Sequence, residues 1–402
     1  MAKIGDSVKK KVPELRFPGF TDDWEECKLG EFSDVRDGTH ASPKYVSQGH
    51  PMVTSKNLTH SGLDMTDVSF LTDKDFNEIN KRSKVSIGDI LFGMIGTIGN
   101  PVIVDRDDFA IKNVALIKEK TSNPITNKWL LQYLKSPSFN RFIQKENAGG
   151  TQKFIALGLI RDMKLRVPEF DEQEKIGAFF KQLDDTIALH QRKLDLLKEQ
   201  KKGYLQKMFP KNGEKVPELR FAGFADDWEQ RKLGEIVQIT MGQSPNSENY
   251  TENPFDHILV QGNADMKNNR VVPRVWTTQI TKQAEKGDLI LSVRAPVGDI
   301  GKTDYDVVLG RGVAAIKGND FIFQQLGKMK EEGFWNRFST GSTFESINSN
   351  DIKEALITIP NEEEQKRIGN FFARIDQAIT LHQRKLDLLK EQKKGFLQKM
   401  FI

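Results

Sequence analysis

The sequence predicts an α+β protein in which two pseudo-symmetric α/β domains are separated by an antiparallel pair of long coiled-coil helices. Two internal repeats predict this arrangement. Residues 189–209 return at 381–401 with a single substitution, and residues 12–32 return at 216–236. Each half of the chain therefore runs from a short anchor (12–32 or 216–236) through a variable region into a long helix, which is the pattern of a tandem duplication.

The repeated C-terminal part of each half has the pattern of a coiled-coil helix. Apolar residues recur at alternating three- and four-residue steps, from Ile176 to Met208 and again from Ile368 to Met400. A seam with this seven-residue period is typical of coiled coils. A helix of roughly 38 residues would be about 57 Å long. We therefore expect a spacer or a dimerisation arm.

Two seam positions are polar in each helix, His190 with Lys201 and His382 with Lys393. Polar residues at such positions fix the register of a coiled coil at some cost in stability, and this is the favoured interpretation. A metal site is the alternative, which lone histidines do not support.

The connection between the halves predicts the direction of the helices. Only the turn-rich segment 210–215 separates the first helix from the second anchor, and the second globular region leads directly into the second helix. A domain of about 150 residues has a radius of gyration near 15 Å, much less than the helix length. The helices should therefore be antiparallel, with the globular parts at opposite ends and the end of the second helix beside the first anchor.

The expected boundaries follow the repeats. They are a flexible leader at 1–11, a first domain at 12–170, a helix at 171–209, a linker at 210–215, a second domain at 216–362 and a second helix at 363–402. Within the domains, short strand patterns alternate with turns rich in Gly, Asn and Thr, and a helix is expected near 128–145 and near 321–338.

Composition excludes several classes of protein. Cys27 is the single cysteine, so no internal disulfide or thiolate metal cluster is expected. No apolar stretch is long enough to cross a membrane and the start lacks a signal sequence, so we expect a cytoplasmic protein. Each 21-residue repeat carries six Lys or Arg residues against two acidic ones, although the whole chain has a net charge of +4. This skew favours nucleic acid or an acidic partner, a solvated helix face being the alternative.

The two variable regions share a skeleton but differ in their loop residues. Similar heads with different polar loops suit the reading of two short sequences on one DNA duplex, because base edges are read by such side chains. The candidate DNA contacts of the first region are Lys44, Ser55, Lys56, Asn57, Thr151 and Lys153. Those of the second are Gln243, Ser244, Gln261, Asn263, Arg294, Ser342 and Thr343. Arg294 is the strongest, since arginine can bond guanine bidentately. Loop solvation or turn capping is the alternative for each.

With these motifs the chain resembles the specificity (S) subunits of type I restriction-modification systems. The resemblance covers nearly the whole chain. It rests on two copies of PELRFxGFxDDWExxKLGE, on DGTHASPKY, TSKNL, GQSP and LSVRAPVG in the loops, and on the twin helices. It implies two target-recognition domains that each read half of a bipartite DNA site. It also implies helices that separate them and bind two methyltransferase (M) subunits.

The resemblance further implies a subunit without catalysis or a cofactor of its own. The M subunits would methylate adenine with S-adenosylmethionine, and motor-nuclease (R) subunits, where present, would use ATP and Mg²⁺ to translocate and cut DNA. The residues agree: PVGDIGKT (296–303) has proline where a phosphate loop needs its first glycine. NPFD (253–256) falls short of the Asn-Pro-Pro-aromatic motif of adenine methyltransferases. Two alternatives stay open: a stand-alone DNA-binding transcriptional regulator with duplicated heads, and a coiled-coil scaffold that binds no DNA.

Overall fold

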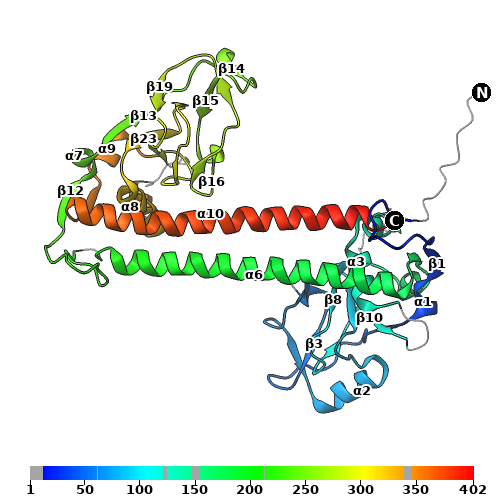
Figure 1. Ribbon diagram of the computed structural model, residues 1–402. Coiled ribbons are helices and arrows are strands. Elements are labelled where there is room, and N and C mark those ends of the chain that lie inside the picture. The colour runs from blue at the N-terminus through cyan, green and yellow to red at the C-terminus, as the bar shows by residue number, and fades with distance from the viewer. Residues whose placement is uncertain (1–11, 61, 121–124, 147–153, 212, 339–345) are drawn as a thin grey trace, which may run out of the picture. The chain divides into compact units, whose positions relative to one another are not determined.

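The chain divides into two units, both of which mix helices and strands (Figure 1). Unit 1 combines Met1–Leu189 with Leu386–Ile402, and unit 2 is His190–Lys385. The computed structural model describes residues 12–60, 62–120, 125–146, 154–211, 213–338 and 346–402. Within these ranges no helix combines the length and apolarity that crossing a membrane requires.

Two long helices, α6 (Phe170–Met208) and α10 (Glu362–Lys399), each contribute residues to both units (Figure 1). Acidic residues occupy the first turn of both helices, where they complement the helix dipole. The apolar seam that predicted these helices is buried at Ile176, Phe180, Leu194, Ile368, Phe372 and Leu386. The two long helices of the predicted fold class are thus confirmed.

Contacts within unit 1 show that α6 and α10 run antiparallel. The rings of Phe179 and Phe396 pack edge to face with 5.0 Å between centroids. Asp184, five residues after Phe179 in α6, pairs with Lys393 at 2.6 Å. Lys393 is three residues before Phe396 in α10. Residue numbers thus fall along one helix as they rise along the other.

The same relationship holds within unit 2. Lys201 pairs with Asp376 at 2.7 Å, and the ring of Tyr204 lies 5.0 Å from that of Phe371. The antiparallel pairing predicted from the chain connection is confirmed in each unit. Both seam lysines, Lys201 and its counterpart in α10, are neutralised by an aspartate of the facing helix.

Unit 1 is built on an antiparallel four-stranded sheet of order β2-β10-β7-β8, with a three-stranded sheet β6-β3-β9 beside it. Strand β7 is buried throughout because both faces of the sheet are covered, one by α3 and α4 and the other by the smaller sheet. Its elements are β1 (Glu25–Lys28), α1 (Leu29–Phe32), β2 (Ser33–Asp37), β3 (His50–Val53), η1 (Ser55–Asn57), β4 (Leu58–Thr59), β5 (Gly62–Leu63), β6 (Ser69–Leu71), α2 (Asp73–Ser83), β7 (Ile90–Gly93), β8 (Gly99–Ile103), β9 (Ala110–Ile111), β10 (Val114–Glu119), α3 (Asn127–Lys135), α4 (Pro137–Glu146), α5 (Leu157–Arg161) and β11 (Lys164–Val167).

Unit 2 repeats this plan with a six-stranded sheet of order β13-β23-β20-β21-β17-β16 and a five-stranded sheet β14-β18-β15-β22-β19. Its elements are β12 (Glu229–Lys232), α7 (Leu233–Ile236), β13 (Gln238–Met241), η2 (Ser247–Asn249), β14 (Tyr250–Thr251), β15 (His257–Val260), η3 (Asn263–Asp265), β16 (Met266–Lys267), β17 (Arg270–Val271), β18 (Trp276–Thr277), β19 (Lys282–Ala284), β20 (Leu289–Ser292), β21 (Ile300–Lys302), β22 (Val307–Leu309), β23 (Val313–Lys317), α8 (Asp320–Glu331), η4 (Phe334–Phe338), α9 (Ser349–Lys353) and β24 (Leu356–Ile359).

Each anchor is fastened to the start of the long helix of its own half. In unit 1 the Arg16 guanidinium donates to both carboxylate oxygens of the fully buried Glu172, at 2.7 and 2.8 Å, and the Trp24 indole N–H donates to the same carboxylate at 3.1 Å. In unit 2 Arg220 bonds Glu364 in the same bidentate way, at 2.8 Å twice. The anchor tryptophans, Trp24 and Trp228, are buried core residues, so they dock each anchor on its unit.

The first anchor also contacts the end of α10. The Leu15 N–H donates to the Lys399 carbonyl at 2.9 Å, and Phe401 packs on Trp24 in the core of unit 1. The C-terminal residues of the chain thus complete the unit that its N-terminal half begins, as the internal symmetry predicted.

One helix prediction needs correction. The helix expected near 128–145 is two helices, α3 and α4, which meet at Ser136 and Pro137. Proline lacks the N–H that would continue the helix and forces the preceding residue out of the helical region. Ser136 accordingly has φ −75° and ψ 156°. In unit 2 the segment near 321–338 is likewise divided, with Gly333 at φ +70° between α8 and η4.

Candidate nucleic-acid interface

In unit 2 most of the predicted contact residues lie on loops that meet at the turn Gly310-Arg311-Gly312, between β22 and β23. The Gln243 N–H donates to the Leu309 carbonyl at 2.9 Å, just before the turn. The Gly310 N–H donates to the Val260 carbonyl at 2.7 Å, and the Val293 N–H donates to the Gly312 carbonyl at 2.9 Å. Three loops distant in the sequence are thus held together by backbone hydrogen bonds.

Glycine is required for this close approach of the loops. A Cβ at Gly242 would lie 2.0 Å from the Gly310 carbonyl oxygen, and one at Gly312 would lie 2.1 Å from the Gln261 carbonyl oxygen. No side chain fits at either position without a backbone shift. The glycine-rich loops of the sequence therefore serve the packing of this surface.

The polar side chains of these loops are partly committed to one another. The Ser244 hydroxyl accepts from the Arg311 N–H at 3.1 Å, and the Gln261 amide donates to the Tyr250 hydroxyl at 2.9 Å. Gln243 is exposed, and Asn263 is half-buried as the first residue of η3. The set offers exposed hydrogen-bonding groups on a scaffold whose backbone is fixed.

Two exposed arginines stand at the junction of these loops. Arg294 follows β20, where its carbonyl accepts from the Ser292 hydroxyl at 2.9 Å and its backbone bridges to Ser346. Arg311 occupies the tip of the glycine turn. Across the described ranges neither guanidinium has an intramolecular partner, so both are available to a ligand. Arg311 was missed from the sequence, although an arginine between two glycines at a strand start was a usable signal.

In unit 1 two of the predicted residues hold the loop together. Ser55 and Asn57 are buried in η1. The Ser55 hydroxyl donates to the Asn113 carbonyl at 3.1 Å, and the Asn57 amide donates to the carbonyls of Asp64 and Asp67 at 3.1 and 2.9 Å. Turn capping, the alternative that we weighed for each candidate, describes these two side chains.

The remaining described candidates of unit 1 are lysines. Lys56 is exposed and pairs with the exposed Asp67 at 2.9 Å, and Lys44 is exposed in the loop after β2. Sequence reasoning missed His40, whose ring bonds the Asn113 side chain at 2.8 Å and the Asp37 carboxylate at 2.9 Å. His40 and Asp37 both lie in the DGTHASPKY loop, whereas Asn113 is distant in the sequence.

Four predicted residues fall outside the described ranges: Thr151, Lys153, Ser342 and Thr343. The residues that follow them are placed alike in the two units. Ile155 N–H donates to the Met94 carbonyl at 2.9 Å, and Ile347 N–H donates to the Val293 carbonyl at 3.0 Å. Both bonds fasten the chain to the loop that follows the central strand.

Comparison with known proteins gives one match for each half of the internal repeat. A family model for the type I restriction modification DNA specificity domain matches residues 21–199 and again residues 225–391. The chain belongs to this family. The resemblance to the type I specificity family that the motifs indicated is thus confirmed. The two matches correspond to the two duplicated halves.

Relatives match this specificity-family chain over nearly its whole length. A candidate type I restriction enzyme MjaX specificity subunit of Methanocaldococcus jannaschii is 27% identical over 396 residues, covering 94% of this chain and 92% of the relative. The type I restriction enzyme MjaVIII specificity subunit of the same organism is 21% identical over 414 residues, covering 96% and 93%. The crystal structure of a type I restriction-modification system S subunit from M. genitalium has the same fold, with a TM-score of 0.69 at 15% identity, and covers 97% of this chain and 99% of that one.

Proposed function

We propose that this specificity chain reads a bipartite DNA site, one half with each unit, and that it performs no catalysis itself. In this proposal α6 and α10 set the number of unread base pairs between the half-sites and bind two M subunits. The M subunits bring S-adenosylmethionine and methylate adenine. R subunits, where present, bring ATP and Mg²⁺ chemistry, and this chain requires no cofactor.

The observation that carries the proposal is one structural position that holds a different type of side chain in each unit. Ile95 in unit 1 and Arg294 in unit 2 follow corresponding central strands, and each forms an isolated bridge to the segment that returns beside it, at Phe154 and Ser346 respectively. Ile95 is exposed, as is Phe154. An apolar side chain suits the methyl group of thymine, whereas an exposed arginine suits guanine. Equivalent frameworks with different exposed groups are what two different half-sites need.

A second position varies in the same way. The turn between β9 and β10 has two residues, Lys112 and Asn113, whereas the turn between β22 and β23 has three. The hydrogen bonds from Lys112 N–H to the Val53 carbonyl and from Gly310 N–H to the Val260 carbonyl align the two turns. The turn of unit 2 is therefore one residue longer, and it carries the exposed Arg311. It adds a cation to one interface and leaves the shared framework unchanged.

The test is co-expression of the full chain with a candidate M subunit in a host without N6-methyladenine, followed by mapping of that base across the genome. We expect a stable complex and a methylated motif with two specific parts and a gap. A chain that binds one operator tightly without M subunits would be a stand-alone regulator. A chain with no salt-dependent retention on duplex DNA would be a scaffold. Either result would reject the proposal.

A further inference from the structure

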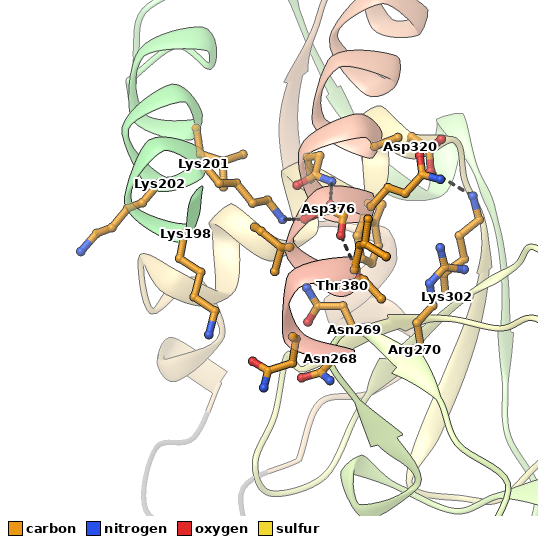
Figure 2. Close-up of a pocket in the computed structure, with 18 of the residues that line it drawn as sticks. Lys198, Lys201, Lys202, Asn268, Asn269, Arg270, Lys302, Asp320, Asp376 and Thr380 are labelled. Carbon is orange, nitrogen blue, oxygen red and sulfur yellow. Dashed lines mark hydrogen bonds and ion pairs between the residues drawn. The ribbon is translucent and has the colours of Figure 1, made fainter. Parts of the chain in front are cut away.

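Unit 2 contains an open groove of about 870 Å³, whose lining shares no residue with the loop cluster described above (Figure 2). One wall is the part of α6 around Lys198 and Lys202, and the floor is the part of α10 between Ala373 and Arg384. The opposite rim is the β16–β17 hairpin with its turn, Asn268 and Asn269. All of these residues belong to unit 2.

The asparagine turn is a fixed feature of this groove. Asn268 and Asn269 have φ of +51° and +59°, as the two central residues of a type I′ hairpin turn require. The Lys302 N–H donates to the Asn269 carbonyl at 2.9 Å, which ties the turn to β21. Both side chains are exposed, so their amide N–H groups are presented to whatever enters the groove.

Most carboxylates of the groove are already neutralised by its own cations. Asp376 pairs with Lys201 at 2.7 Å and accepts from the Gln324 amide at 2.7 Å. The two other paired carboxylates are Asp304, with Arg270 at 2.8 Å, and Asp320, with Lys302 at 2.9 Å.

Outside these ion pairs the lining contains three cations and two carboxylates. The cations are Lys198, Lys202 and Arg384, and the carboxylates are Glu199 and Glu331. All three are exposed and have no intramolecular partner within the described ranges. Figure 2 shows the Lys198 side chain extending toward the side of the groove where Asn268 and Asn269 lie, whereas Lys202 points outward. Lysine and asparagine donors on facing rims are the groups that hold phosphate oxygens without reading sequence.

We propose that this groove binds the sugar-phosphate backbone of DNA beside the half-site read by unit 2. The inference rests on the proposed function and adds a second, sequence-independent contact to it. The hairpin connects the two sites, because β16 begins directly after η3, which starts with Asn263. Five residues of extended chain span at most about 17 Å. The backbone of the asparagine turn is therefore within about 17 Å of that of Asn263, which is the length of about five base pairs.

The test compares Lys198→Ala with Lys390→Ala in the full chain assembled with its M subunits. Lys390 is the matched control because it lies in the identical sequence LLKEQKK of α10, within unit 1. Unit 1 has no asparagine pair in its β4–β5 hairpin, where His60 and Ser61 stand in the sequence. Affinity is measured by fluorescence anisotropy for a duplex with the methylated motif and for a scrambled duplex, at several salt concentrations.

For Lys198→Ala we expect binding to both duplexes to weaken by a similar factor of about five. The slope of log affinity against log salt should fall by about 0.9, the value for one phosphate contact. The methylated motif should stay the same. Asn269→Asp should act in the same direction, since aspartate tolerates the left-handed conformation but repels phosphate.

Three outcomes would overturn the inference. The first is that Lys198→Ala changes neither the affinity for DNA nor the salt slope. The second is that Lys390→Ala loses as much affinity as Lys198→Ala, which would indicate that the general charge of the helices is responsible. The third is that Lys198→Ala loses M subunits while its salt slope is unchanged, which would indicate that the groove binds an acidic protein segment. Failure of the proposed function is distinguishable from all three. In that case the wild-type complex itself would neither prefer any duplex nor methylate DNA.

Discussion

His190 and His382 face each other in unit 2, with 3.1 Å between their Nδ1 atoms and 5.3 Å between their ring centroids. At this distance one imidazole donates an N–H hydrogen bond and the other accepts it through its ring nitrogen. The contact supports the interpretation that these seam histidines fix the register of the helices.

The first prediction is that removing this contact weakens the pairing of α6 and α10 within unit 2. His190→Ala leaves the half-buried imidazole of His382 without its partner, and leaving such a polar group unbonded costs about 1 kcal/mol. Chemical denaturation should therefore show a lower free energy of unfolding for His190→Ala. The exposed His257, changed to Ala, should keep the wild-type value.

A second prediction concerns Lys135, near the Lys393–Asp184 ion pair of unit 1. Burial, with a smaller contribution from Lys393, lowers the pKa of the Lys135 ammonium to about 8, while Asp184 opposes the change. The folded pKa is below the unfolded value of 10.5, so between these values the unfolded chain binds more protons. Stability due to this group should therefore rise as the pH increases from about 8 to about 10.5.

Lys135→Met should accordingly raise the free energy of unfolding at pH 7 by up to about 3 kcal/mol, and the gain should shrink toward pH 10.5. The matched control is Lys328→Met in α8. That lysine lies at the corresponding helical position and pairs with Glu332 at 2.7 Å, so its replacement should not stabilise. A pH-independent gain for Lys135→Met would assign the effect to apolar packing.

A third prediction concerns the anchor clamps. Glu364 is fully buried and bonded twice by Arg220, so Glu364→Gln would leave a largely buried guanidinium without its counter-charge. Removing one partner of a buried pair costs about 3 to 5 kcal/mol. We expect a lower melting temperature for unit 2 in calorimetry. Lys207 and Glu218 form an exposed pair 3.0 Å apart, so Glu218→Gln should leave the melting temperature almost unchanged.

The fourth prediction separates the two interfaces. Arg294→Ala should lower affinity for the half-site of unit 2 by about 1 to 3 kcal/mol and relax the motif at one position. Ile95→Ala should affect the other half-site. Mapping N6-methyladenine for each variant checks both changes. A motif and affinity untouched by Arg294→Ala, in a protein of normal stability, would remove Arg294 from the interface.

The sequence predicted the parts of this fold that depend on repetition. Identical segments with a seven-residue apolar period indicate two equivalent helices, and the short linker at 210–215 leaves them one direction. The roles of the loop residues were harder to predict, because a serine or asparagine in a turn looks the same in the sequence whether it faces a ligand or caps its own backbone. Ser55 became recognisable as a capping group once Asn113, distant in the sequence, was placed beside it, and Asn57 once the backbone of Asp64 was seen to fold back on it.

The last prediction tests the helices as a spacer. Deleting one heptad from each helix, 193–199 and 385–391, removes corresponding residues of the repeat and preserves both the seam and the antiparallel register. Seven residues shorten a helix by about 10 Å, which is the length of about three base pairs. We expect the complex to methylate a motif with both half-sites unchanged and a gap about three base pairs shorter.

A deletion in α6 alone is the control, because it breaks the pairing of Lys201 with Asp376 and should abolish methylation through misfolding. Circular dichroism and thermal melting distinguish that result from a change in spacing. If the symmetric deletion folds, binds M subunits and methylates the original motif with its original gap, the helices do not measure the distance between the half-sites. The spacing would then be set by the M subunits, and the role of α6 and α10 would be limited to assembly.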